Sequence, residues 1–160
     1  MNRRNTLALT LGLCSGIALL LGNGTVFAQQ SETDKVKAAI DGFHAALDSL
    51  DIRKMEEVWA HDPFVMMVNP RDKSLSIGWD SVKKNWEATF NFWTELKTPR
   101  TDGPHIHISG NVAWVNGMVV ANGKPKAGVG VSAPTFETVI FEKRGDRWLI
   151  VSHSAWRSPQ

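Results

Sequence analysis

The sequence contains one cysteine, Cys14, and no tyrosine among its 160 residues. Cys14 lies within an apolar N-terminal run that we expect to be removed from the mature protein. The remaining chain then has no thiol, which excludes disulfide frameworks, cysteine nucleophiles and zinc sites built from cysteine. A packed core must therefore stabilise the fold.

An export signal is predicted over residues 1–28. Arg3 and Arg4 give a positively charged start, residues 7–21 form an apolar run, and Ala28 ends a Val-Phe-Ala segment typical of a cleavage site. A membrane span needs about 20 apolar residues, so we expect cleavage after Ala28, with an uncleaved anchor as the alternative. The mature protein is then expected to be periplasmic or secreted, with no membrane association after removal of the signal.

The mature chain has no excess of charge of one sign. Without Arg3 and Arg4, 16 of the 18 basic residues remain, against 16 acidic residues. Proteins that bind nucleic acids usually present a basic excess or stripe, so no nucleic-acid partner is expected. The length suits one domain, which we place at residues 29–160.

Apolar spacing predicts helices in the first part of the mature chain and mainly strands after them. Helices are expected at residues 31–50, after the capping residue Asp51, and after the capping residue Asp80, because apolar side chains recur there every three or four residues. Strands are expected over residues 64–68, 105–109, 112–120, 135–142 and 148–156, and a mobile loop over residues 123–133. This order predicts an α+β fold with three N-terminal helices packed on an antiparallel sheet.

Both faces of the predicted sheet carry apolar residues. Along residues 112–120, the positions that point to either face are largely apolar. A sheet with one solvated face should alternate apolar with polar residues. We therefore expect helices to cover one face and a second subunit to cover the other, which predicts a homodimer through the sheet.

Four short motifs follow one another in a specific order and spacing. They are Trp59-Ala60-His61-Asp62, Ile77-Gly78-Trp79-Asp80, the segment 110–115 (Gly-Asn-Val-Ala-Trp-Val) and the segment 147–154 (Arg-Trp-Leu-Ile-Val-Ser-His-Ser). In this order they resemble the SnoaL-like branch of the nuclear transport factor 2-like superfamily, over residues 31–158. The resemblance implies a cone-shaped fold, in which a curved sheet wraps around helices, and a dimer through the sheet. Unrelated activities share this cone, so the fold alone does not give the function.

The resemblance also argues against one familiar reaction. Steroid isomerases of this fold use a tyrosine on the first helix and a carboxylate base at the end of the first strand. An ungapped comparison through the Trp-Ala-His-Asp motif places Phe43 and Met67 at these positions. Neither side chain can transfer a proton, so this route is not expected.

Two histidine motifs are candidates for chemistry. His61 and Asp62 could form a general base and its orienting carboxylate if both point into the cone, although Asp62 could simply fix a turn before Pro63. His105 and His107 share a strand face and could bind a metal, but the sequence places no third ligand near them. We therefore take His61 and Asp62 as the catalytic candidates and expect no metal and no cofactor.

Aromatic and small polar residues supply the candidate ligand contacts. Small polar groups among aromatic ones are typical of a ligand pocket, although they can equally satisfy one another within a core. The candidate contacts are Phe43, Trp59, Trp79, Trp86, Trp114, Asn116, Thr138 and Ser152. We expect a domain that binds a small, largely apolar molecule. The alternatives are an acid–base enzyme of isomerase, dehydratase or cyclase type that uses His61 and Asp62, and a non-catalytic dimerisation module.

Overall fold

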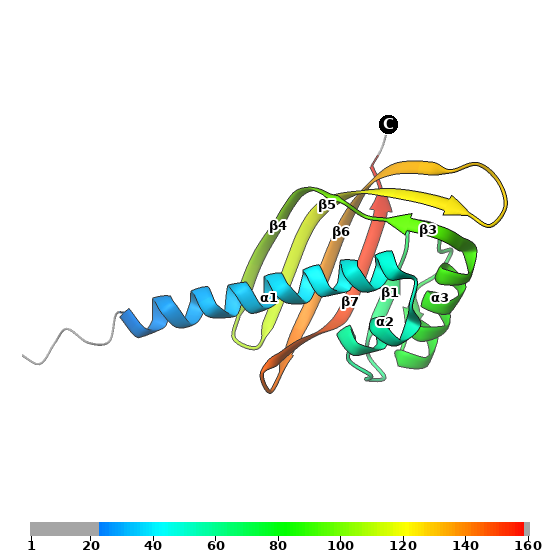
Figure 1. The fold of residues 1–160 in the computed structure, drawn as a ribbon. Coiled ribbons are helices and arrows are strands. Elements are labelled where there is room, and N and C mark those ends of the chain that lie inside the picture. Colours follow the sequence, from blue (N-terminus) through cyan, green and yellow to red (C-terminus); the bar gives the residue numbers. More distant parts are fainter. Residues whose placement is uncertain (1–22, 159–160) are drawn as a thin grey trace, which may run out of the picture.

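The structure, a computed structural model, describes residues 23–158, with side chains from residue 32 onward. Three helices lie against one face of a strongly curved sheet (Figure 1). This arrangement confirms the predicted α+β class. No helix among the described residues is both long and apolar enough to cross a membrane. The expected signal peptide, residues 1–28, lies outside the residues whose side chains are described and stays a prediction.

The helices form where the apolar spacing predicts them. They are α1 (Asn23–Ser49), α2 (Ile52–Val58) and α3 (Trp79–Phe92). Asp51 caps α2 as predicted, because its Oδ1 accepts a hydrogen bond of 3.0 Å from the backbone N–H of Arg53. The N-cap of α3 is Gly78 rather than Asp80, which lies in the first turn. Gly78 has a φ of 80°, which glycine adopts without strain, and its N–H donates to the Val65 carbonyl at 2.8 Å.

The strands form one seven-stranded sheet in the order β2-β1-β7-β6-β5-β3, with β4 also paired to β5. They are β1 (Met66–Val68), β2 (Ser76–Ile77), β3 (Trp93–Lys97), β4 (Arg100–Ser109), β5 (Val112–Pro125), β6 (Val131–Arg144) and β7 (Arg147–Arg157). The sheet is mixed rather than wholly antiparallel, because β1 runs parallel to β7.

The prediction of a mobile loop over residues 123–133 is wrong. β5 and β6 remain paired as far as Gly123 and Val131, so only residues 126–130 connect the two strands. The glycine and proline content of this segment favoured a loop. A continuous ladder of cross-strand hydrogen bonds overrides that local preference, which is weak in strands compared with tertiary context.

The core lies between the helices and the face of the sheet that they cover, which we call the inner face. Val36, Ile40 and Phe43 of α1 are fully buried there, opposite inward-pointing strand residues such as Val139 and Ile150. Val82, Trp86 and Phe90 of α3 are buried as well. The opposite face of the sheet, the outer face, has no covering element among the described residues.

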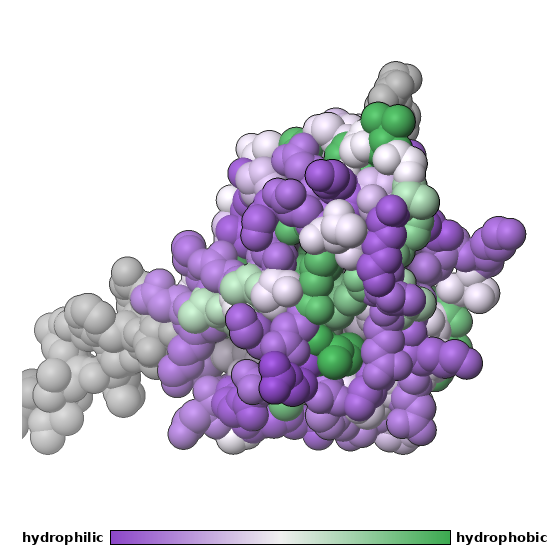
Figure 2. All heavy atoms as spheres, turned by 45° about the vertical axis from the view of Figure 1, so that its right-hand side comes forward, coloured by the Kyte–Doolittle hydropathy of each residue, from purple (hydrophilic) through white to green (hydrophobic). Residues whose placement is uncertain are grey.

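The surface is not uniformly polar. On the side of α3, a strip of hydrophobic residues runs between broad hydrophilic regions (Figure 2). Several large hydrophobic side chains are exposed elsewhere, including Met66 (41%), Trp114 (38%) and Trp156 (49%). These three belong to β1, β5 and β7, so exposed apolar side chains occur on three strands of the sheet.

Candidate functional site

A cavity of about 270 Å³ lies on the inner face, between α1, α3 and strands β3, β5, β6 and β7. This volume is close to the lower end of the range of about 300–1,000 Å³ that is usual for ligand pockets. Its apolar wall includes Leu47, Trp86, Leu96, Val119, Ala121 and Ala155. The cavity therefore suits a small and largely apolar molecule.

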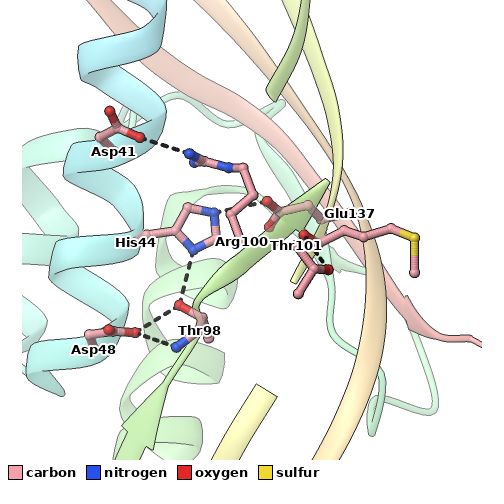
Figure 3. A network of polar contacts seen from close by, with 8 residues as sticks. Asp41, His44, Asp48, Thr98, Arg100, Thr101 and Glu137 are labelled. Carbon is pink, nitrogen blue, oxygen red and sulfur yellow. Dashed lines mark hydrogen bonds and ion pairs between the residues drawn. The ribbon is translucent and has the colours of Figure 1, made fainter. Parts of the chain in front are cut away.

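A polar network forms the floor of the cavity (Figure 3). His44 extends from α1, and its Nε2 lies 2.8 Å from Oε1 of Glu137 on β6. Its Nδ1 lies 3.0 Å from the hydroxyl oxygen of Thr98. That hydroxyl donates to Asp48 at 2.7 Å, so its oxygen is left to accept from the His44 ring. The His44 ring is thus held between the Glu137 carboxylate and Thr98.

Burial and charge set the protonation of the other two titratable groups at the floor. Burial alone would raise the pKa of Glu137, but the hydrogen bond and charge interaction with His44, together with the charge of Arg100, outweigh it and lower that pKa. Burial lowers the pKa of His153 to about 4. At neutral pH the floor therefore presents an ionised carboxylate and a neutral imidazole.

His153 and Trp86 each bring a buried ring nitrogen without a hydrogen-bond partner among the described residues to the cavity lining, and of the two only His153 can also accept a hydrogen bond. The side chain of His153 lines the cavity, only 3% of the residue is exposed, and Nδ1 is buried without a hydrogen-bond partner among the described residues. Its ring packs near Phe43 and Trp86, with centroid distances of 5.1 and 5.8 Å. A buried polar group without a partner costs about 1–3 kcal/mol, so this imidazole is a candidate for pairing with a ligand.

One side of the wall is held by the segment between β1 and α3. Oδ2 of Asp72 accepts hydrogen bonds from the backbone N–H of Asn69 at 2.7 Å and from Nδ2 of Asn85 at 2.9 Å. All three residues line the cavity. These bonds tie the turn at residues 69–72 to α3 and so give the wall a defined shape.

The two catalytic candidates of the sequence lie outside this cavity. His61 is exposed and stacks on Trp79, with ring centroids 4.1 Å apart, and Asp62 pairs with Arg144 at 2.9 Å. The condition for catalysis by this pair, that both side chains point into the cone, is therefore not met. The backbone of Ala60 is bonded to β7 and its side chain is buried, which turns the next residue outward.

The predicted ligand contacts divide into three groups. Trp86 lines the cavity, whereas Phe43 and Trp59 are buried in the core and Trp79 is packed at its edge. The remaining four lie on the outer face of the sheet: Trp114, Asn116, Thr138 and Ser152. The hydroxyl of Thr138 donates to Asn116 at 2.7 Å, so these two satisfy each other away from the cavity. The prediction that these four line a pocket is wrong, because strand alternation separates two faces without showing which is inner.

His44, Glu137 and His153 are not among the site residues predicted from the sequence. Two signals were available. His44 follows Ile40 by four residues and thus falls on the apolar stripe of α1. Glu137 alternates with Val139 on the apolar face of β6. A polar residue at a position that should be buried was the feature that marked the site.

The two histidines of β4 contact other side chains. His107 stacks on Trp114 at 4.3 Å, and Nε2 of His105 lies 3.2 Å from the carboxylate of Asp102. Within residues 32–158, no three His, Cys, Asp or Glu side chains are grouped so that they could hold a metal ion.

The profile of the SnoaL-like domain matches residues 36–155, which is most of the chain. The chain belongs to this family. A comparison with curated proteins gave no match. The predicted resemblance is thus confirmed at the level of the family.

Solved structures agree with the SnoaL-like assignment. A proposed dehydratase of the nuclear transport factor 2-like family from Streptomyces avermitilis superposes with a TM-score of 0.74 and 19% identity, covering 82% of this chain and 99% of its own. A superfamily protein from Salmonella enterica gives 0.72 and 18%, over 85% and 94%. A proposed scytalone dehydratase from Novosphingobium aromaticivorans gives 0.68 and 13%, over 84% and 89%. Identities this low show only that the SnoaL-like fold is shared. The activity has to be inferred from the residues of the site.

Proposed function

We propose that this SnoaL-like domain binds a small, largely apolar molecule that carries a hydrogen-bonding group, with His153 as its polar contact. The observation that carries the proposal is the buried imidazole of His153, which lines the cavity and has no hydrogen-bond partner among the described residues. A ligand oxygen near this ring would recover the hydrogen bond that burial removes. The apolar wall would supply most of the binding free energy, in proportion to the area buried.

The names of related structures support a pocket for small molecules. The Streptomyces avermitilis protein is described as a proposed dehydratase, and the Novosphingobium aromaticivorans protein as a proposed scytalone dehydratase. Both names refer to a dehydration, and the second names the small molecule scytalone. The fold is shared with this chain, so a hollow of the same kind is expected here, while the ligand depends on the residues of this cavity.

The test is binding of one- and two-ring aromatic alcohols, with 2-naphthol as the first probe. Trp86 and Trp93 line the cavity, so binding should quench the tryptophan fluorescence. Ala155→Met should fill the cavity and abolish the quenching. Ser154→Met, one residue away and on the outer face, should leave it unchanged. Equal quenching in both variants would place the bound probe elsewhere and refute the proposal.

A second candidate, acid–base catalysis, is favoured by the ionised carboxylate of Glu137 at the cavity. His44 engages Oε1 at 2.8 Å, and no described residue hydrogen-bonds to the second carboxylate oxygen. Glu137 would take a proton from a carbon next to a carbonyl group, and neutral His153 would donate a hydrogen bond to that carbonyl oxygen. His44, Thr98 and Asp48 would orient the base. This candidate replaces His61 and Asp62, which do not line the cavity.

Proton exchange provides a test that needs no knowledge of the natural substrate. The probe is 2-tetralone, a two-ring ketone with exchangeable protons next to the carbonyl. Wild-type protein in D₂O should accelerate deuterium incorporation, followed by NMR, and Glu137→Gln should abolish the acceleration. His61→Ala should not change it. Exchange at the uncatalysed rate with bound ketone would leave ligand binding as the function.

We also propose that the outer face of the sheet pairs with a second copy of the chain. The support is the exposed apolar surface at Met66, Trp114 and Trp156, on three different strands. Trp114→Glu should convert a dimer to a monomer in light scattering at micromolar concentration, whereas His61→Glu on another surface should not. A wild-type monomer at that concentration would refute this arrangement.

A further inference from the structure

The cavity changes in character from its floor to its rim. On β7, the successive inward positions are His153 and Ala155, which are buried, and Arg157, which is exposed. On β6, the inward positions run from buried Glu137 to Val131, which is 39% exposed. All five residues line the cavity. Because β6 and β7 are antiparallel, the start of β6 and the end of β7 form the rim together.

The rim carries two arginines. The guanidinium carbon of Arg71 lies 3.4 Å from the centroid of the Phe92 ring and 5.6 Å from that of Trp93, and both rings line the cavity with it. Stacking uses the flat faces of a guanidinium and leaves its N–H groups, which lie in the plane, free to bind an anion. Arg157 lies at the end of β7, next to Thr135 of β6.

These two positive charges are not neutralised within residues 32–158. Neither arginine forms a salt bridge with a described carboxylate. The carboxylates that line the cavity are Glu137 and Asp72. Glu137 is bound to His44 at the floor, and Asp72 accepts hydrogen bonds from Asn69 and Asn85. The half of the cavity nearest the rim thus holds two cationic groups and one anionic group. The N–H groups of both arginines remain free to donate hydrogen bonds to a ligand.

We propose that the ligand is an amphipathic carboxylate. Its carboxylate binds Arg71 and Arg157 at the rim, its apolar body lies against the wall, and a hydroxyl or carbonyl oxygen at its far end reaches His153. A guanidinium binds a carboxylate through two parallel N–H···O bonds, which a neutral amide or ester cannot reproduce. The inference rests on the proposed function of the same cavity and adds the chemical class of the ligand.

The experiment compares two molecules of almost the same shape, 6-hydroxy-2-naphthoate and 6-hydroxy-2-naphthamide. Calorimetric titration at pH 7 and low salt should show that the carboxylate binds wild-type protein about five- to tenfold more tightly, as expected for partly exposed charge pairs. The preference should shrink as salt is added, because exposed charges are screened.

The arginines are tested by the double variant Arg71→Gln/Arg157→Gln. It should bind the two compounds with equal affinity, at the affinity of the amide for wild type. The matched control is Lys73→Gln/Lys84→Gln, which removes two exposed positive charges that do not line the cavity. The control should keep the preference for the carboxylate. Circular dichroism should show that all variants are folded.

The outcomes separate the two proposals. Equal affinity of wild type for both compounds would overturn the carboxylate inference and leave the ligand pocket in place. Absence of binding by either compound would overturn the inference and count against the pocket as well. A preference for the carboxylate that survives in the arginine double variant would also overturn the inference. A preference reduced equally in the arginine and lysine double variants would show general charge attraction and would overturn it as well.

Discussion

Polar side chains differ in burial and in hydrogen-bond partners between the two faces of the sheet. On the inner face, Glu137 and His153 are almost fully buried, and Glu137 is paired with a residue of another element, His44 of α1. On the outer face, Thr138 bonds to its cross-strand neighbour Asn116 in contact with solvent. Strands β5, β6 and β7 contribute to both faces, so the difference arises from what covers each face.

The contrast shows why the inner face holds the site. Water can replace any partner lost on the outer face, so its polar groups add little to stability and need no fixed geometry. Water cannot do so for buried groups, whose partners must be supplied by the fold or by a ligand. Polar groups that remain on the inner face are therefore expected to have a function or a costly structural role.

The largest expected difference between the faces concerns two glutamates of β6. Glu137→Ala removes one partner of the buried pair with His44 and should lower the free energy of unfolding by roughly 3–5 kcal/mol. Glu142→Ala, five residues along the same strand, removes a partner of Arg144 that is 27% exposed, and should cost less than about 1 kcal/mol. Urea unfolding followed by tryptophan fluorescence measures both values.

The proposed difference between the faces is refuted if both substitutions lower the free energy of unfolding by the same amount. A small effect of Glu137→Ala would mean that His44 is not held by this carboxylate. Glu137→Gln adds a control, since the amide keeps the size of the side chain and changes its charge. We expect the amide variant to lie between wild type and Glu137→Ala.

Acidification should also act through the inner face. The pKa of His153 is lowered to about 4 by burial, from an ordinary value of 6.5. Between these values the unfolded chain binds a proton that the folded protein does not, so stability falls as the pH decreases, by up to about 3 kcal/mol. His153→Gln should flatten this decrease, measured by urea unfolding at several pH values from 7 to 4. His105→Gln, an exposed histidine of β4, should leave the slope unchanged.

The groups that face His153 do not reverse this prediction. Glu137 and Asp72 are acidic and favour protonation of the ring, whereas His44 opposes it. Stability that comes from the lowered pKa of Glu137 is present above its ordinary value of 4.5 and is lost below that value. Protonation of Glu137 therefore adds to the loss of stability only at the acidic end of the pH range. A slope that is the same in wild type and His153→Gln would contradict the buried, neutral state of His153.

The helices could be predicted because apolar residues recur along each of them every three or four positions. Val36, Ile40 and Phe43 recur as a buried stripe of α1, and Val82 and Trp86 do so on α3. Strand existence could be predicted in the same way. Strand ends could not, since the extension of β5 and β6 beyond residue 123 depends on pairing between segments, which local composition does not reveal.

The contribution of β7 to the site could not be predicted, because a bulge changes the face to which its side chains point. Phe141 pairs with Ile150, whereas its neighbour Ile140 pairs with Ser152, so Val151 is an extra residue. Before the bulge Ile150 points inward, and after it the inward positions are those of His153 and Ala155. Strict alternation from Ile150 selects Ser152 instead, and therefore the wrong face. A bulge has no clear signature in a single sequence.

The smallest expected effects allow a direct comparison, because threonine can be replaced by valine both at the cavity and on the outer face. Thr98→Val replaces a hydroxyl that is 7% exposed and joins His44 to Asp48, and it should cost about 1–3 kcal/mol through loss of buried hydrogen bonds. Thr138→Val replaces an outer-face hydroxyl of the same size and should change the free energy of unfolding by no more than about 0.5 kcal/mol, since water can solvate the Asn116 amide. Urea unfolding at pH 7 compares the two directly. An equal loss of stability would mean that Thr138 is buried as completely as Thr98. A dimer that closes the outer face would bury it in this way. The Thr138→Val measurement should therefore be repeated in the monomeric Trp114→Glu background.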